Sequence, residues 1–108
     1  MSKVASNTGN GSAVQFLDDA FAEECAYLLK VFLQKHKDYG KGNILEIGEM
    51  GIAFRLAEKV SRLKNLLAKS DGPVNESLDD TWTDIAVYAV IAKLYRSEKF
   101  QKLEVKEK

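Results

Sequence analysis

Apolar residues return every three or four positions over most of the chain, which is the spacing of one face of an α-helix. The first such segment starts at Ala13, and it should end near Tyr39, where Gly40 can supply a left-handed cap. Its apolar stripe consists of Phe16, Leu17, Ala20, Phe21, Leu28, Val31 and Phe32. The pattern therefore predicts a first amphipathic helix over residues 13–39.

A second amphipathic pattern predicts a helix from about Glu49 to Lys69, after a segment from Ile44 whose structure the pattern leaves open. Its apolar stripe consists of Ile52, Leu56, Val60, Leu63 and Leu67. A polar strip on the opposite side consists of Arg55, Glu58, Arg62 and Asn65. We expect the apolar stripe to face the core.

A third segment is apolar on nearly every side between residues 82 and 92. A turn at Pro73 precedes it, and Ser77 followed by Asp80 matches a capping box that would begin a helix. A helix with no polar face is buried centrally or covered by another subunit. The charged end of the chain, residues 93–108, is expected to fray into solvent.

These elements predict an all-α fold, a small antiparallel helical bundle. A chain of 108 residues allows one domain, which we place at residues 13–98. A flexible segment rich in Gly, Ser and Asn precedes it at 1–12, and a charged tail follows at 99–108. Because a domain of this size with a polar site is marginally stable alone, we expect oligomerisation, as a homodimer or homotetramer, to complete the bundle.

The overall charge excludes several classes of function. Sixteen basic residues balance sixteen acidic ones, so no net charge draws the chain to nucleic acid or to a membrane surface. No apolar run reaches the length of a membrane span. Cys25, the single cysteine, is expected to be buried, and His36, the single histidine, to be solvated. We expect a cytoplasmic protein, because one cysteine fits a reducing compartment.

Although the net charge of the chain is zero, residues of like charge cluster in consecutive segments. Residues 55–69 hold five cations and one acid, whereas residues 71–84 hold five acids and no cation. Helices joined by a short turn should be antiparallel neighbours and bring these blocks together. Asp84 lies a turn inside its helix on the side of Tyr88, where a carboxylate needs compensation. Either a divalent cation or an ion pair with Arg55 or Arg62 would supply it.

Carboxylates without His or Cys favour a hard cation, Mg²⁺ or Mn²⁺, and substrate phosphates can complete the coordination shell of such a cation. Arg55, Lys59 and Arg62 would then bind phosphates. The alternative is an exposed basic face in which Glu58 pairs with Arg62 one turn away. The chain has no Gly-rich phosphate loop, which excludes a P-loop kinase or GTPase.

Three segments of the chain stand out together: Lys35-His36-Lys37-Asp38-Tyr39-Gly40, the run from Arg55 to Leu66, and the run from Glu76 to Tyr88. Together they resemble the nucleotide modification associated domain 1 family, a small helical family of phages and bacteria. That family is in turn similar to the MazG-like, all-α NTP pyrophosphatases. The resemblance covers roughly residues 30–96.

The resemblance implies a MazG-like nucleoside triphosphate pyrophosphohydrolase, which converts a (d)NTP to a (d)NMP and pyrophosphate with Mg²⁺. Metal ligands implied in this way are Glu58, Glu76, Asp80 and Asp84, with Glu58 or Asp84 also the catalytic base. Phosphates would be bound by Arg55, Lys59 and Arg62, and the sugar or base by Asn65 or Tyr39.

The sequence departs from the superfamily motif at two acid positions, which are occupied by Arg55 and Thr81. Two alternatives therefore stay open. One is a non-catalytic nucleotide-binding module linked to nucleotide modification. The other is a structural helical oligomerisation module, in which the polar strip forms ion pairs.

Overall fold

The described part of the chain is built from four helices and contains no strand. The computed structural model describes residues 15–69 and 75–106, and for residues 75–77 it describes the backbone alone. The helices are α1 (Leu17–Tyr39), α2 (Gly42–Ala68), α3 (Asn75–Arg96) and α4 (Lys99–Lys102). The predicted all-α fold is confirmed. None of these helices is both long enough and apolar enough to cross a membrane.

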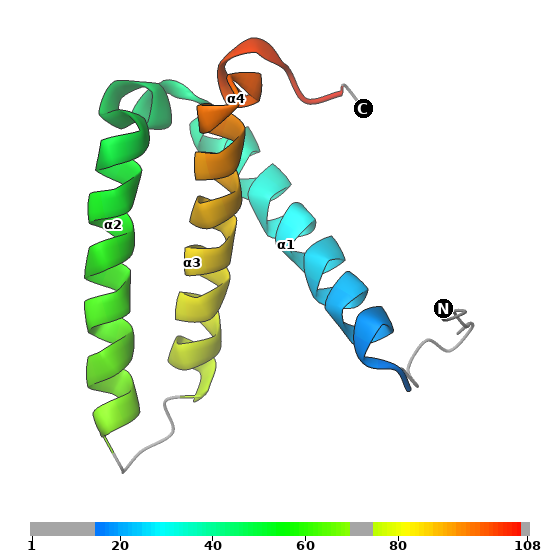
Figure 1. Cartoon of the computed structure of the whole chain (residues 1–108), viewed down its shortest axis with the longest axis vertical. Helices are drawn as coiled ribbons and strands as arrows, with labels where there is room; N and C mark the ends of the chain where they lie inside the picture. Colours follow the sequence, from blue (N-terminus) through cyan, green and yellow to red (C-terminus); the bar gives the residue numbers. More distant parts are fainter. Residues whose placement is uncertain (1–14, 70–74, 107–108) are drawn as a thin grey trace.

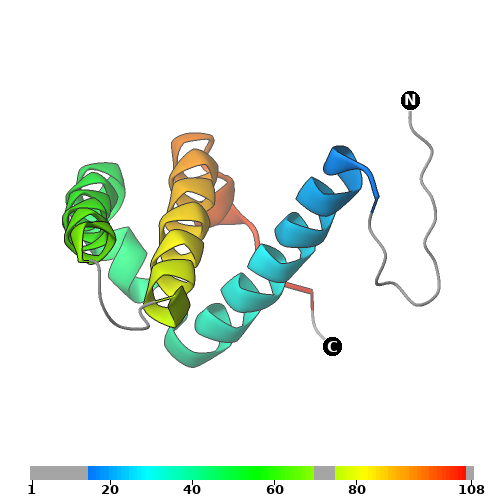
Figure 2. The ribbon, with the colours of Figure 1, turned by 90° about the horizontal axis from the view of Figure 1, so that it is seen from below.

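Helix α3 lies in the middle of the bundle, as Figure 1 and Figure 2 show. Helix α2 runs antiparallel beside it, α4 folds back at its C-terminal end, and α1 contacts it before diverging toward the N-terminus. The third helix is predicted to be buried centrally or covered by another subunit, and in one chain it is buried on one side, at Val87 and Ile91. Its outer side remains open, with Trp82 and Val90 54% and 48% exposed.

The core is a small cluster where all four helices meet. Its buried members are Ile44, Ile52, Val87, Ile91 and Phe100. Ile52 is completely buried, and the partly buried side chains of Leu28, Val31 and Phe32 reach the cluster from α1. The core therefore holds α2, α3 and α4 more firmly than it holds α1.

Two glycines in the same backbone conformation direct the chain from α1 into α2. Gly40 has φ 68° and ψ −158°, and Gly48 has φ 68° and ψ −174°, a region that is open essentially to glycine alone. The predicted end of the first helix at Tyr39 is confirmed, but the cap is extended with positive φ rather than left-handed helical. At Gly48 the chain bends, so the helix predicted from Glu49 follows a short helical segment that contains Ile44.

The predicted apolar stripe of α2 faces the core only in part, since Ile52, Leu56 and Leu63 pack there and the rest of the stripe is exposed. Ile52 and Leu63 are buried as expected, but Val60 and Leu67 are 42% and 59% exposed. Arg55 and Lys59 are partly buried instead. The reason lies on α3, where the Tyr88 hydroxyl and the Asp84 carboxylate accept hydrogen bonds from these two cations.

The C-terminal region does not fray through residue 106, contrary to the prediction. After α3 ends, α4 folds back and buries Phe100, which is 5% exposed. The Lys41 Nζ donates hydrogen bonds to the carbonyl oxygens of Leu103 (2.6 Å) and Gln101 (3.4 Å). The buried Phe100 and the hydrogen bonds from Lys41 therefore hold this segment against the bundle despite its high charge.

Smaller differences concern helix starts and the cysteine. Helix α3 begins at Asn75, so Ser77 lies inside the helix and not at its cap. Helix α1 begins at Leu17, and the segment 1–12 that is predicted to be flexible lies outside the described residues. Cys25 is exposed, not buried, because it lies in the half of α1 that diverges from α3.

Candidate functional site

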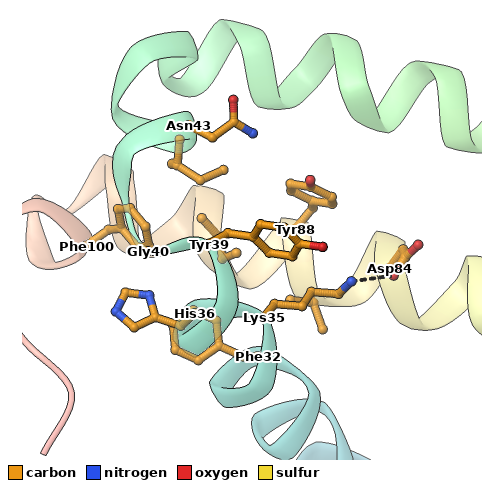
Figure 3. Close-up of a pocket in the computed structure, with 12 residues that line it drawn as sticks. Phe32, Lys35, His36, Tyr39, Gly40, Asn43, Asp84, Tyr88 and Phe100 are labelled. Carbon is orange, nitrogen blue, oxygen red and sulfur yellow. Dashed lines mark ion pairs between the residues drawn. The ribbon is translucent and has the colours of Figure 1, made fainter.

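A cleft of about 120 Å³ lies where α1, the start of α2, α3 and α4 meet (Figure 3). Its aromatic lining comes from Phe32, His36, Tyr39, Tyr88 and Phe100. Its polar lining comes from Lys35, Asn43 and Asp84. The cleft therefore combines flat apolar walls with charged groups, which is the usual composition of a small-molecule site.

The Asp84 carboxylate lies between two lysines from different helices. Lys59 Nζ on α2 is 3.4 Å from Asp84 Oδ2, and Lys35 Nζ on α1 is 3.8 Å from Asp84 Oδ1. The Asp84 side chain is 33% exposed. Asp84 thus pairs with these two lysines and not with Arg55 or Arg62, the partners that the sequence predicted. Two cations beside one carboxylate give the surroundings of Asp84 a net positive charge.

Tyr88 positions two further cationic contacts at the edge of the cleft. Arg55 Nη1 donates to the Tyr88 hydroxyl at 3.3 Å, and Arg55 Nη2 donates to Asn43 Oδ1 at 3.5 Å. Lys59 Nζ lies 5.6 Å from the centre of the Tyr88 ring, within the range of a cation–π contact. Arg55 is therefore engaged by Tyr88 and Asn43, which explains why Asp84 pairs with lysines.

His36 forms part of the aromatic wall and is partly buried, rather than solvated as predicted. Its ring stacks on Phe32 with centroids 5.5 Å apart and meets Phe100 edge-on at 6.5 Å. Tyr39, which was predicted to contact the sugar or base, lines the cleft with 76% of its surface exposed. In Figure 3 its ring extends from the end of α1 toward Tyr88.

Several predicted site residues lie away from the cleft. Glu58, Arg62, Asn65 and Asp80 are exposed and do not line it. The side chain of Glu76 is outside the described residues. Within the described ranges, no three His, Cys, Asp or Glu side chains gather into a group that could hold a metal ion. One copy of the described chain therefore does not fit a carboxylate cage for Mg²⁺, and the metal site stays a prediction.

Ten of the twelve residues that line the cleft were absent from the predicted site, among them Lys35, Asn43, Tyr88 and Phe100. Lys35 and Tyr88 stand in the short segments that carry the family resemblance, which was a usable signal. Phe100 gave none, because it stands alone in a charged stretch.

The sequence profile of the family described as nucleotide modification associated domain 1 matches residues 35–95, more than half of the chain. The chain belongs to this family. No curated protein and no solved structure matches it.

The segment matched by the nucleotide modification associated domain 1 family contains the charged side of the cleft. Lys35 and Asp84 lie inside it, whereas the aromatic residues Phe32 and Phe100 lie outside. The family pattern therefore coincides with the cations, the carboxylate and Tyr88.

Proposed function

We propose that this member of the nucleotide modification associated domain 1 family binds a nucleotide in the cleft beside Asp84. The observation that carries the proposal is that three cations contact polar side chains of one aromatic-lined cleft: Lys35, which lines it, and Lys59 pair with Asp84, and Arg55 donates to Tyr88. A nucleotide has the matching chemistry, since its phosphates are anionic and its base is flat.

The phosphates are assigned to the cationic edge. A phosphate oxygen competes with the Asp84 carboxylate for Lys35 and Lys59, and both pairs are long enough, at 3.8 Å and 3.4 Å, to rearrange easily. Charge-assisted hydrogen bonds from ammonium groups to phosphate are stronger than neutral ones. Arg55 adds a planar fork suited to two phosphate oxygens.

The base is assigned to the aromatic side. Tyr39 is free to stack on it, because its ring is largely exposed at the cleft. The Asn43 amide lines the same cleft and offers both a donor and an acceptor to a base edge. Tyr39 therefore keeps the role that the sequence suggested, whereas Asn65 lies elsewhere.

Calorimetric titration of the full chain with dNTPs and dNMPs tests the binding proposal. Lys59→Met should weaken binding roughly tenfold or more, since one phosphate contact is lost. Lys64→Met is the matched control, because Lys64 is an exposed lysine on the same helix, whereas Lys59 pairs with Asp84 in the cleft. Equal effects of the two variants would refute the site.

Hydrolysis is a second candidate, favoured by the position of Asp84. Its carboxylate faces the proposed phosphate-binding edge, and the resemblance to MazG-like pyrophosphatases implies a metal-binding acid at this position. Bound Mg²⁺ or Mn²⁺ would neutralise phosphate charge and activate water. The ligands would be Asp84 with Glu58, Glu76 or Asp80, which requires these acids to come closer together than in one described chain. The predicted base is Glu58 or Asp84.

Release of pyrophosphate from (d)NTPs, measured with and without Mg²⁺, tests this second candidate. Asp84→Asn should abolish turnover while nucleotide binding persists. Binding without turnover by the unaltered chain would instead favour the non-catalytic module. If Asp84→Asn shifts only the melting temperature and no nucleotide binds, the structural alternative is correct.

The setting of this function is also a proposal. We place it in the cytoplasm and in a homo-oligomer, a homodimer or homotetramer. The oligomer is supported by the exposed apolar side chains of α1 and of the outer side of α2, where Met50 and Phe54 are 68% and 67% exposed.

A further inference from the structure

The Asp84 carboxylate occupies the place between two lysines that a bound phosphate would need. Lys59 Nζ lies 3.4 Å from Asp84 Oδ2, and Lys35 Nζ lies 3.8 Å from Asp84 Oδ1, so each carboxylate oxygen faces a lysine from a different helix. Figure 3 shows Lys35 extending from α1 to Asp84. An anionic group of the protein itself is therefore already bound at the cationic edge of the cleft.

These two contacts are weak enough to be exchanged. Charge-assisted hydrogen bonds between an ammonium group and an anionic oxygen are about 2.7–2.9 Å long, and both pairs are longer than this. The Asp84 side chain is 33% exposed, so it can turn toward water when a ligand takes its place. A ligand that offers more negative charge than a carboxylate can therefore displace Asp84 from the lysines.

The cations have other contacts that do not involve Asp84. Lys59 Nζ lies 5.6 Å from the centre of the Tyr88 ring, and Arg55 donates to the Tyr88 hydroxyl. Lys35 belongs to the last turns of α1, the part of this helix that packs on the core. Neutralising Asp84 should therefore leave the cationic edge in place and remove only the anion that competes there.

The charge of a ligand decides whether it gains by this exchange. A carboxylate spreads one negative charge over two oxygens. A phosphodiester also has one charge and two free oxygens, so it gains little by displacing Asp84. A terminal phosphate carries about −1.5 to −2 charge near pH 7 and presents three acceptor oxygens, so it gains both charge and hydrogen bonds.

We propose that Asp84 is an internal competitor for the phosphate site and sets a threshold of affinity that only ligands with a terminal phosphate pass. This role rests on the proposed nucleotide site and narrows its ligands. Nucleotides with a free terminal phosphate bind, whereas cyclic nucleotides and the diester backbone of nucleic acids do not. Loss of the Asp84 charge therefore strengthens binding, which is the opposite of what deletion of a ligand-holding residue does.

Calorimetric titration of the full chain in EDTA, without divalent cations, tests this role of Asp84. The ligands are dNMPs and their methyl phosphate esters, which keep the base and the sugar but carry a diester with one negative charge. The unaltered chain should bind the dNMP and no ester measurably. Asp84→Asn should tighten dNMP binding roughly three- to thirtyfold, the effect of two partly exposed ion pairs, and should make ester binding measurable.

Two further variants separate competition from general charge repulsion. Asp79→Asn is the matched control, because Asp79 is an exposed acid of the same helix that does not line the cleft, and it should change binding less than about twofold. In a Lys59→Met chain, Asp84→Asn should tighten binding less than in the unaltered chain, because one contested contact is gone. Circular dichroism checks that each variant is folded.

Three results would overturn the role of Asp84 while leaving the nucleotide site intact. They are unchanged or weaker dNMP binding by Asp84→Asn, equal effects of Asp79→Asn and Asp84→Asn, and ester binding by the unaltered chain as tight as that of the dNMP. Equal tightening with and without Lys59 also contradicts the competition. If no dNMP or dNTP binds either to the unaltered chain or to Asp84→Asn, the proposed function itself is wrong and this role falls with it.

Discussion

Helices α2 and α3 form a closed pair, whereas α1 is only partly attached. All three segments repeat apolar residues at helical spacing, yet α2 and α3 bury Ile52, Leu63, Val87 and Ile91, and α1 buries nothing. Amphipathic periodicity shows that a helix has an apolar face. It does not show whether that face is covered within the same chain.

Polar contacts also hold α2 and α3 together more firmly than they hold α1. Between α2 and α3, the contacts of Arg55 with Tyr88 and of Lys59 with Asp84 accompany the apolar packing. The attachment of α1 depends on its last turns, where Phe32 packs on the core and Lys35 reaches Asp84. The closed pair should therefore respond strongly to substitution, and α1 weakly.

The largest expected contrast is between Ile52→Ala and Leu17→Ala. Ile52 is fully buried, so its truncation should lower the free energy of unfolding by about 2–5 kcal/mol. Leu17 is 85% exposed, and its truncation should cost less than about 0.5 kcal/mol in a chain dilute enough to be monomeric. Urea unfolding measures both. Similar losses would show that α1 is held as firmly as α2.

Gly48→Ala should cost about 1–3 kcal/mol, because alanine is strained at φ 68° although its Cβ would meet the Tyr95 hydroxyl at an ordinary contact distance of 3.5 Å. Gly42→Ala is the control, since Gly42 is helical with no atom within 4 Å of an added Cβ, and it should be neutral or slightly stabilising. Thermal unfolding compares them. If both glycines tolerate alanine equally, the bend at Gly48 does not decide how α2 meets α3.

Lys41→Met should cost about 1–2 kcal/mol, because it leaves the carbonyl oxygens of Leu103 and Gln101 without their lysine donor. The Lys41 side chain is 16% exposed. Lys102→Met, which removes an exposed pair with Glu98, should change stability by less than about 0.5 kcal/mol. Hydrogen exchange of α4 should quicken in the first variant alone, and unchanged exchange there would contradict the contact.

Controls aside, the smallest loss of stability is expected for Asp84→Asn. The carboxylate is a third exposed, so its two ion pairs should contribute at most about 1 kcal/mol to stability. High salt should reduce the difference between this variant and the unaltered chain, because salt screens both pairs. Chemical unfolding at low and high salt measures it. A larger, salt-independent loss would show that Asp84 is chiefly a structural residue.

The features that the sequence predicted correctly depend on local chemistry. The end of α1 at Tyr39 follows from Gly40, and the long segment of α2 from Glu49 follows Gly48. Asp84 was singled out because a carboxylate among apolar positions needs a partner, and it does lie in the cleft.

Features that depend on distant contacts were predicted less well. The side of α2 that faces α3 is decided by Tyr88 and Asp84, which the apolar stripe of α2 does not register. Lys35 reaches the cleft because α1 ends beside α3, and Phe100 because α4 folds back. The sequence therefore predicted which kinds of side chain form the site more reliably than which individual residues do.

Phe100 has a consequence for how relatives could differ in what they bind. It forms part of the core and of the cleft wall, yet it lies five residues beyond the segment that the family profile matches. A replacement of residues 97–106 by the corresponding segment of another family member would therefore reshape the aromatic end of the cleft. Lys35, Asp84 and Tyr88 would stay in place, so ligand preference could diverge while the charged end is inherited unchanged.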